Sequence, residues 1–169
     1  MIARRTCIGV FDSGFGGLTV LKALLRLIPN ADYLYFGDTA RLPYGSKSAE
    51  TVARYAVGAA HYLEQRGAQA LVIACNTATA LALDKITQAA NVPVVGVIEP
   101  GTERAASESE NKKVVVIGTE ATDKICAFLG HPRTCPPRRA HSARAMLRQE
   151  RRLGQLFVCK IREARLIFS

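Results

Sequence analysis

The sequence predicts an α/β fold, a mostly parallel sheet flanked by helices. Two observations lead to this prediction. Short apolar runs alternate with longer segments of helical periodicity. The apolar runs are each followed by polar or glycine-rich residues. Open α/β sheets bind ligands at the carboxyl ends of their strands, where such residues are typical. The expected strands are residues 6–11, 32–36, 71–75, 93–98 and 113–117, and the expected helices are 18–28, 49–66, 78–90 and 102–108.

The first expected strand leads into a glycine-rich turn at residues 12–17, Asp-Ser-Gly-Phe-Gly-Gly. The apolar residues at 18, 21, 24, 25 and 28 that follow have helical spacing, and Pro29-Asn30 ends that helix. The turn lacks both the spacing of a dinucleotide-binding loop and a Gly-Lys-Ser/Thr sequence. We therefore expect its glycines to let a small anion approach the backbone, or only to form the turn.

The second expected strand ends in Gly37-Asp38-Thr39, and a rigid loop at residues 42–45, Leu-Pro-Tyr-Gly, comes next. Ser48 is expected to cap the helix over 49–66, because serine is a favoured N-cap residue. Gly67 is expected to end it, because glycine adopts the left-handed conformation that follows many helices.

The central candidate residue is Cys75, which closes the apolar run that begins at Leu71. Asn76 or Thr77 is expected to cap the helix that follows. A thiol at this position lies beside the partial positive charge of a helix N-terminus, which favours the thiolate form. From its position alone, Cys75 could equally be a small buried hydrophobic residue, which is a common role of a free cysteine.

The last two expected strands end in Glu99-Pro100-Gly101 and in Gly118-Thr119. Polar residues from all the strand ends would then gather at one rim, which is the best indication of a site in the residues themselves. Asp12 at that rim suits an ammonium group or proton transfer, with helix capping as the plainer alternative. A serine hydrolase is not indicated, because no histidine lies in a motif that supports Ser13.

The bulk composition indicates a globular protein. A length of 169 residues and an apolar content of 49% predict one domain, or one and a half, with an ample core. No run of 18 apolar residues and no signal-peptide core is present, so we expect a cytoplasmic location. The odd cysteine count, five, favours reduced thiols over disulfides.

The net charge of +9 is concentrated at one end of the chain. Residues 1–122 contain 12 Lys/Arg and 11 Asp/Glu, whereas residues 123–169 contain 11 and 3. In this basic tail, Cys126, His131, Cys135 and His141 match no common zinc-site spacing, so no metal is expected. The tail arginines have no aromatic residues among them, which favours a solvated segment over a nucleic-acid-binding one.

Four sequence blocks, in this order, carry a resemblance that covers residues 6–122. They are residues 9–20 (GVFDSGFGGLTV), 36–45 (FGDTARLPYG), 74–79 (ACNTAT) and 95–101 (VGVIEPG). With these blocks the sequence closely resembles the glutamate racemases of the cofactor-independent aspartate/glutamate racemase family. The family interconverts L- and D-glutamate and supplies D-glutamate for peptidoglycan. The resemblance thus implies an isomerase that acts on glutamate, a small-molecule substrate, without a cofactor.

The resemblance also implies roles for individual residues. Cys75 is similar to one of the family's two catalytic thiols, and Asp12 to the carboxylate that assists the thiol and faces the substrate amino group. Positions that hold the amino and carboxylate groups of the substrate match Ser13, Tyr44, Gly45, Asn76, Thr77 and Thr119. A thiolate is a compact base for a weakly acidic α-proton, and amide and hydroxyl donors stabilise the charge that develops on the carboxylate. Family members are often homodimers, and no membrane or nucleic-acid partner is implied.

The sequence departs from the family in its second half. The family's second thiol lies in a Cys-Thr-His motif, which this sequence does not contain. We expect residues 1–97 to form the first α/β domain, 98–122 to begin a second one, and 123–169 to be a divergent, poorly ordered tail, as in a truncated or frame-shifted product. Such a chain would hold half a catalytic site. Two alternatives stay open: a non-catalytic protein whose tail binds nucleic acid or an acidic partner, and a related racemase acting on aspartate or another amino acid.

Overall fold

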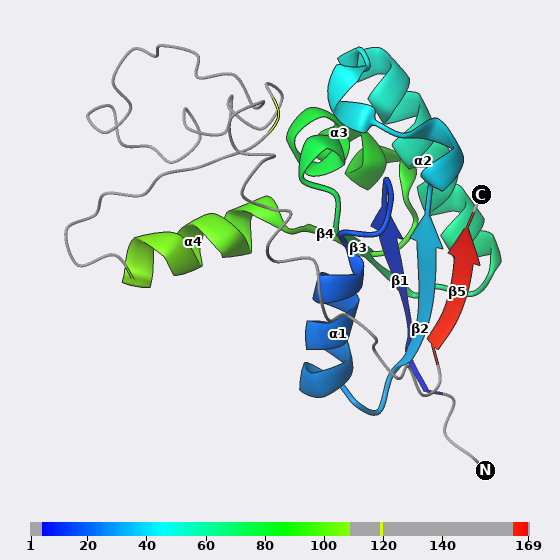
Figure 1. Cartoon of the computed structure of the whole chain (residues 1–169). Helices are drawn as coiled ribbons and strands as arrows, with labels where there is room; N and C mark the ends of the chain where they lie inside the picture. Colours follow the sequence, from blue (N-terminus) through cyan, green and yellow to red (C-terminus); the bar gives the residue numbers. More distant parts are fainter. Residues whose placement is uncertain (1–4, 109–118, 120–163, 169) are drawn as a thin grey trace.

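A computed structural model describes residues 5–108, 119 and 164–168 of the chain (Figure 1). In this part of the chain five parallel strands form one sheet, in the order β4-β3-β1-β2-β5. The strands are β1 (Cys7–Asp12), β2 (Asp32–Gly37), β3 (Ala70–Ile73), β4 (Val94–Gly96) and β5 (Ala164–Phe168). The helices are α1 (Leu18–Leu27), α2 (Ala49–Gln65), α3 (Asn76–Ala89) and α4 (Ile98–Glu108), with 3-10 turns η1 (Thr39–Arg41) and η2 (Tyr44–Ser46). The predicted α/β class with a parallel sheet is confirmed.

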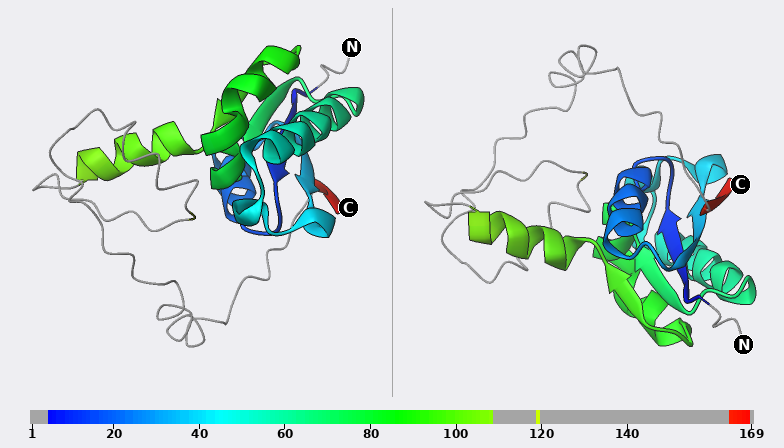
Figure 2. Two further views of the ribbon diagram at one scale, coloured as in Figure 1. Left: turned by 90° about the horizontal axis from the view of Figure 1, so that it is seen from above. Right: turned by 90° about the horizontal axis from the view of Figure 1, so that it is seen from below.

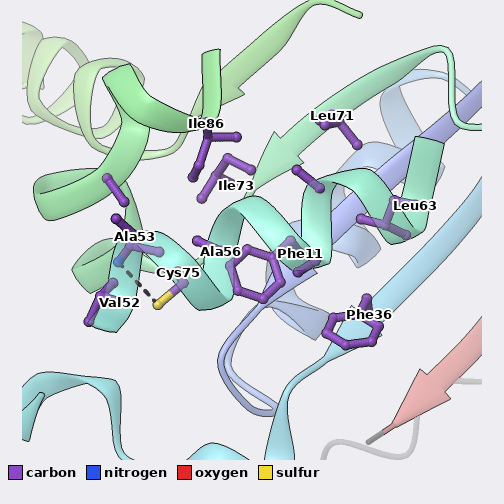
Figure 3. Packing of buried hydrophobic residues seen from close by; sticks show 14 of the residues in the cluster. Phe11, Phe36, Val52, Ala53, Ala56, Leu63, Leu71, Ile73, Cys75 and Ile86 are labelled. Atoms are coloured by element: carbon purple, nitrogen blue, oxygen red, sulfur yellow. Dashed lines mark hydrogen bonds between the residues drawn. The ribbon is translucent and has the colours of Figure 1, made fainter. Parts of the chain in front are cut away.

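Side chains alternate between two hydrophobic cores along the strands, because successive residues of a strand point to opposite faces. Phe11, Phe36 and Ile73 belong to the core that α2 and α3 cover, which Figure 3 shows from close by. Val10 and Tyr35 belong to the core beneath α1. Figure 2 shows α1 on one side of the sheet and α2 and α3 on the other. The strands read as nearly continuous apolar runs because both faces of the sheet are covered.

The pairing register brings the ends of β1, β2 and β3 to one rim. Asp12 pairs with Gly37, and Phe11 pairs with Ile73. Just beyond the strands, the Asp38 N–H donates to Asp12 O over 2.9 Å and the Ala74 N–H to Phe11 O over 2.7 Å. The expected convergence of these three strand ends is confirmed.

Helix α2 begins and ends where its flanking residues predicted. The Ser48 hydroxyl oxygen accepts a hydrogen bond from the Thr51 N–H over 3.2 Å, so Ser48 is the N-cap. Gly67 follows the helix with a φ of 97°, in the left-handed region that favours glycine. Both local predictions are confirmed.

The start of α3 differs from the prediction. The strand ends at Ile73 rather than at Cys75, and the N-cap is Cys75 itself, with Asn76 and Thr77 inside the first turn. The Cys75 sulfur accepts a hydrogen bond from the Ala78 N–H, which is the bond that a capping hydroxyl would accept. The prediction of Asn76 or Thr77 as the cap is therefore wrong, because the chain leaves the strand two residues early.

The start of α4 also differs. Glu99-Pro100-Gly101 was expected as a loop after a strand that ended at residue 98, but these residues lie in the first turn of α4. Proline is tolerated there because the first backbone N–H groups of a helix have no partner within it. Helix α4 extends away from the sheet (Figure 1). It begins at the residue where a second domain was predicted to start, and that boundary stays a prediction.

Strand β5 was not expected, because no strand was predicted after residue 122. It pairs in parallel with β2, Tyr33 opposite Ala164 and Gly37 opposite Phe168. Residues 113–117, the cysteines and histidines between 126 and 141, and the arginines of 138–152 lie outside the described residues. Across the described ranges, none of the helices is both long enough and apolar enough to cross a membrane.

Candidate active site

Cys75 lies at the rim between β3 and α3, almost completely buried at 5% exposure. Its sulfur is 3.4 Å from the Ala78 nitrogen, which donates to it along the dashed line that leaves the Cys75 sulfur in Figure 3. The sulfur is also 3.2 Å from the Ser13 hydroxyl oxygen, to which the thiol donates. The positive end of α3 also points toward this sulfur. A negative charge on the sulfur would therefore meet an amide donor, a hydroxyl that can turn to donate, and a helix N-terminus.

Asp12 ends β1, the strand next to β3, and is 6% exposed. Its Oδ2 accepts hydrogen bonds from the Gly17 N–H over 2.9 Å and from the Tyr35 hydroxyl over 3.3 Å. Gly17 is the N-cap residue of α1, so Asp12 holds the turn just before this helix, but no side chain caps α1 itself. The other oxygen, Oδ1, has no hydrogen bond to the described residues, and it leaves Asp12 one oxygen for a ligand.

Three predicted substrate-binding residues meet at a second point of the rim. The hydroxyl oxygens of Thr77 and Thr119 are 3.3 Å apart and share a hydrogen bond. Thr119 also packs on Gly45, where an added Cβ would lie 2.6 Å from Thr119 Cγ2. The neighbouring Asn76 is exposed in the first turn of α3. Hydroxyl groups and first-turn amides together suit a carboxylate ligand.

The Tyr44 side chain is buried away from solvent, at 2% exposure. Its hydroxyl donates to Asp38 Oδ2 over 2.6 Å, and the same oxygen accepts a bond from Arg41 over 3.0 Å. Burial, followed by the hydrogen bond and charge of Asp38, raises the pKa of Tyr44, so the phenol stays a donor. The hydroxyl thus anchors the loop that contains Tyr44 and Gly45. A ligand could contact the backbone of these two residues, but not the Tyr44 hydroxyl.

Two polar residues of this rim were given no role from sequence. Asp38 was recognised as part of a strand end, and Tyr35 only as part of an apolar strand. Both are fully buried, with relative exposures of 0%. A tyrosine in a strand that is covered on both faces needs a partner for its hydroxyl, which is the signal that points to Tyr35. No group of His, Cys, Asp and Glu side chains in the described part of the chain is arranged to hold a metal ion.

A sequence profile of the Asp/Glu/Hydantoin racemase family matches residues 8–131. The chain belongs to this family. Among curated relatives, a glutamate racemase of Koribacter versatilis is 69% identical over 128 residues, which cover 76% of this chain and 44% of that protein. Membership of the family, predicted from the four sequence blocks, is confirmed.

Solved structures of family members have the same fold. The glutamate racemase of Aquifex pyrophilus superposes with a TM-score of 0.72 at 44% identity, covering 84% of this chain and 60% of that one. The glutamate racemase of Francisella tularensis in complex with D-glutamate superposes with a TM-score of 0.66 at 42% identity, covering 73% and 46%. This chain spans about half the length of the curated relatives that it matches.

Proposed function

We propose that this chain supplies one acid–base half of a glutamate racemase, with Cys75 as the group that exchanges a proton with the substrate α-carbon. The observation that carries the proposal is the position of the Cys75 sulfur at the N-cap of α3, 3.2 Å from the Ser13 hydroxyl. Loss of the thiol proton leaves a charge that the Ala78 N–H, the Ser13 hydroxyl and the helix N-terminus stabilise.

The proposed reaction moves one proton. The Cys75 thiolate takes the α-proton and becomes a thiol, and the electron pair of the C–H bond delocalises into the substrate carboxylate. Return of a proton by the same thiol restores the starting enantiomer, whereas delivery by another acid to the opposite face gives its mirror image. Because the sequence has no Cys-Thr-His motif, Cys75 serves one face of the substrate, and a second acid is needed for the other face.

The two ends of the rim suit the two charged groups of an α-amino acid. In this proposal Oδ1 of Asp12 accepts a hydrogen bond from the substrate ammonium group, and the next residue, Ser13, also binds that group. The hydroxyls of Thr77 and Thr119 and the first amides of α3 can bind the α-carboxylate. The Francisella relative, solved with D-glutamate, supports glutamate as the amino acid. D-Glutamate made in this way would serve peptidoglycan, and a cytoplasmic location and a homodimer remain predictions.

The test is α-proton exchange in D₂O, followed by NMR, together with the optical configuration of the glutamate. We expect Cys75→Ser to slow exchange at least about 100-fold, because a serine hydroxyl is a far poorer base than a thiolate. Serine retains a cap for α3, so the helix should keep its start. Cys7→Ser is the matched control, since Cys7 is the other cysteine of the described residues and lies at the end of β1 that is opposite to the rim.

The outcomes separate the alternatives. Exchange with D-glutamate formed indicates a second acid, and exchange with retention indicates that Cys75 works alone. No exchange by folded wild-type protein, or equal rates for wild type and Cys75→Ser, would contradict the proposal. Aspartate run in parallel tests the related-racemase alternative. No observation in the described residues favours the nucleic-acid alternative.

A further inference from the structure

Tyr35 connects the central strands of the sheet to the turn that holds Asp12. It is the third residue from the end of β2, and its ring lies in the core beneath α1 with a relative exposure of 0%. Its hydroxyl is 3.0 Å from the carbonyl oxygen of Gly14 and 3.3 Å from Oδ2 of Asp12. A phenol has a single proton to donate, so the two acceptors share it. One hydroxyl thus contacts both the carboxylate and the backbone that follows it.

The geometry points to Tyr35 as the positioning residue for Asp12 in the proposed proton transfer. Together with the Gly17 N–H, its hydroxyl fixes Oδ2 on the protein side of the carboxylate. The carboxylate is planar, so a fixed Oδ2 also fixes where Oδ1 lies, the oxygen that the proposed function assigns to the substrate ammonium group. Tyr35 touches no reacting atom in this arrangement and acts through Asp12. This inference rests on the proposed function.

The ionisation of Tyr35 is consistent with this role. Burial, followed by the negative charge of Asp12 and their hydrogen bond, raises the pKa of Tyr35 above the usual range of a tyrosine. The phenol therefore keeps its proton and stays a donor through the whole range in which enzymes work. A side chain that lost its proton here would repel the carboxylate that it now holds.

Tyr33 provides a matched control from the same strand and the same face of the sheet. It is 2% exposed, and its hydroxyl donates to the carbonyl oxygens of Leu24 and Ile28 at the end of α1, both over 2.9 Å. Tyr33→Phe and Tyr35→Phe therefore each remove one buried hydroxyl that two acceptors share. Only the second removes a contact with Asp12, so a general loss of stability should be common to both variants.

The experiment measures α-proton exchange of glutamate in D₂O by the full chain, for both variants, in the wild-type and Asp12→Asn backgrounds. For Tyr35→Phe we expect the maximal exchange rate to fall about tenfold, since one hydrogen bond to a charged group is lost. The glutamate concentration for half-maximal rate should stay within about threefold of wild type. Tyr33→Phe should stay within about twofold on both measures, because its hydroxyl lies at the other end of the strand.

The Asp12→Asn background separates positioning from a structural effect. If Tyr35 acts through Asp12, Tyr35→Phe should change the residual exchange rate of Asp12→Asn by less than about twofold. An equal tenfold loss in both backgrounds, or equal rates for Tyr35→Phe and Tyr33→Phe, would overturn the inference.

A second measurement keeps the inference testable if wild-type protein proves inactive, an outcome that would refute the proposed function alone. Amide hydrogen exchange at Gly17 reports on the Asp12 carboxylate, because that N–H donates to Oδ2. Tyr35→Phe should accelerate exchange at Gly17 about tenfold, and Tyr33→Phe should leave it unchanged. Unchanged protection of Gly17 in Tyr35→Phe would show that Asp12 holds its position without the tyrosine.

Discussion

Replacing Tyr44 with phenylalanine would remove the shorter of the two hydrogen bonds that Tyr44 and Arg41 donate to the buried Asp38 carboxylate. Asp38 is 0% exposed, so water cannot replace the hydroxyl that now donates to it over 2.6 Å. Arg41 would remain as a partner at 3.0 Å, with its own side chain 45% exposed. A hydrogen bond to a charged group contributes about 1.5–3 kcal/mol, and an unmade bond costs the desolvation of its acceptor. We therefore expect Tyr44→Phe to lower the free energy of unfolding by about 2–3 kcal/mol.

The assay is chemical and thermal unfolding of the full chain. For a chain of this length, a loss of about 2–3 kcal/mol corresponds to a fall in Tm of about 5–10 °C. Tyr62→Phe is the matched control, because the half-buried Tyr62 ring packs on Phe36 and its hydroxyl has no hydrogen bond to the described residues. That variant should stay within about 0.5 kcal/mol of wild type.

A double-mutant cycle with Asp38→Asn isolates the bond itself. The loss caused by Tyr44→Phe should shrink when position 38 carries no charge. Equal losses for Tyr44→Phe and Tyr62→Phe, or equal effects of Tyr44→Phe in both backgrounds, would refute the reasoning. The same variant should also weaken glutamate binding, because the Tyr44–Asp38 bond holds the loop that includes Gly45.

Three further predictions use other parts of the fold. Burial raises the pKa of Tyr35 in the folded protein, so the stability that its phenol provides is complete below about pH 10 and is lost as the pH rises further. In denaturant titrations above about pH 10, the free energy of unfolding should therefore fall with pH less steeply for Tyr35→Phe than for wild type, by about 1.4 kcal/mol per pH unit. Ser48→Ala should cost about 1 kcal/mol in the same titrations, because the Thr51 N–H loses its capping partner. Gly58→Ala should instead raise stability by about 0.5–1 kcal/mol, because Gly58 lies inside α2 with nothing within 4 Å of an added Cβ, and a destabilised variant would contradict this.

The features that sequence reasoning predicted correctly are those set by neighbours in the chain. The Ser48 cap, the left-handed Gly67 and the alternation of strands and helices each depend on a few adjacent residues. The meeting of three strand ends follows from parallel pairing alone. The amino-acid sequence alone therefore predicts that the candidate thiol and carboxylate lie at one rim.

The features that were missed depend on contacts between distant segments. Nothing near Tyr35 in the sequence shows that its hydroxyl reaches the turn after β1, and nothing near Asp38 shows that Tyr44 turns back to it. The pairing of β5 with β2 joins segments that are more than 120 residues apart. The cap of α3, predicted at Asn76 or Thr77, was misplaced by one or two residues because the end of β3 depends on its pairing with β1 and β4, which local propensity does not report.

The N-cap position of Cys75 has a consequence for covalent labelling. The sulfur that would react with an electrophile is also the acceptor for the Ala78 N–H. An alkyl group on that sulfur must fit a site that is only 5% exposed, which pushes the sulfur away from the amide and leaves α3 without its cap. An alkylating reagent would thus both block the thiol and loosen the first turn of α3, and a fall in melting temperature on labelling would serve as a screening signal for compounds that reach Cys75.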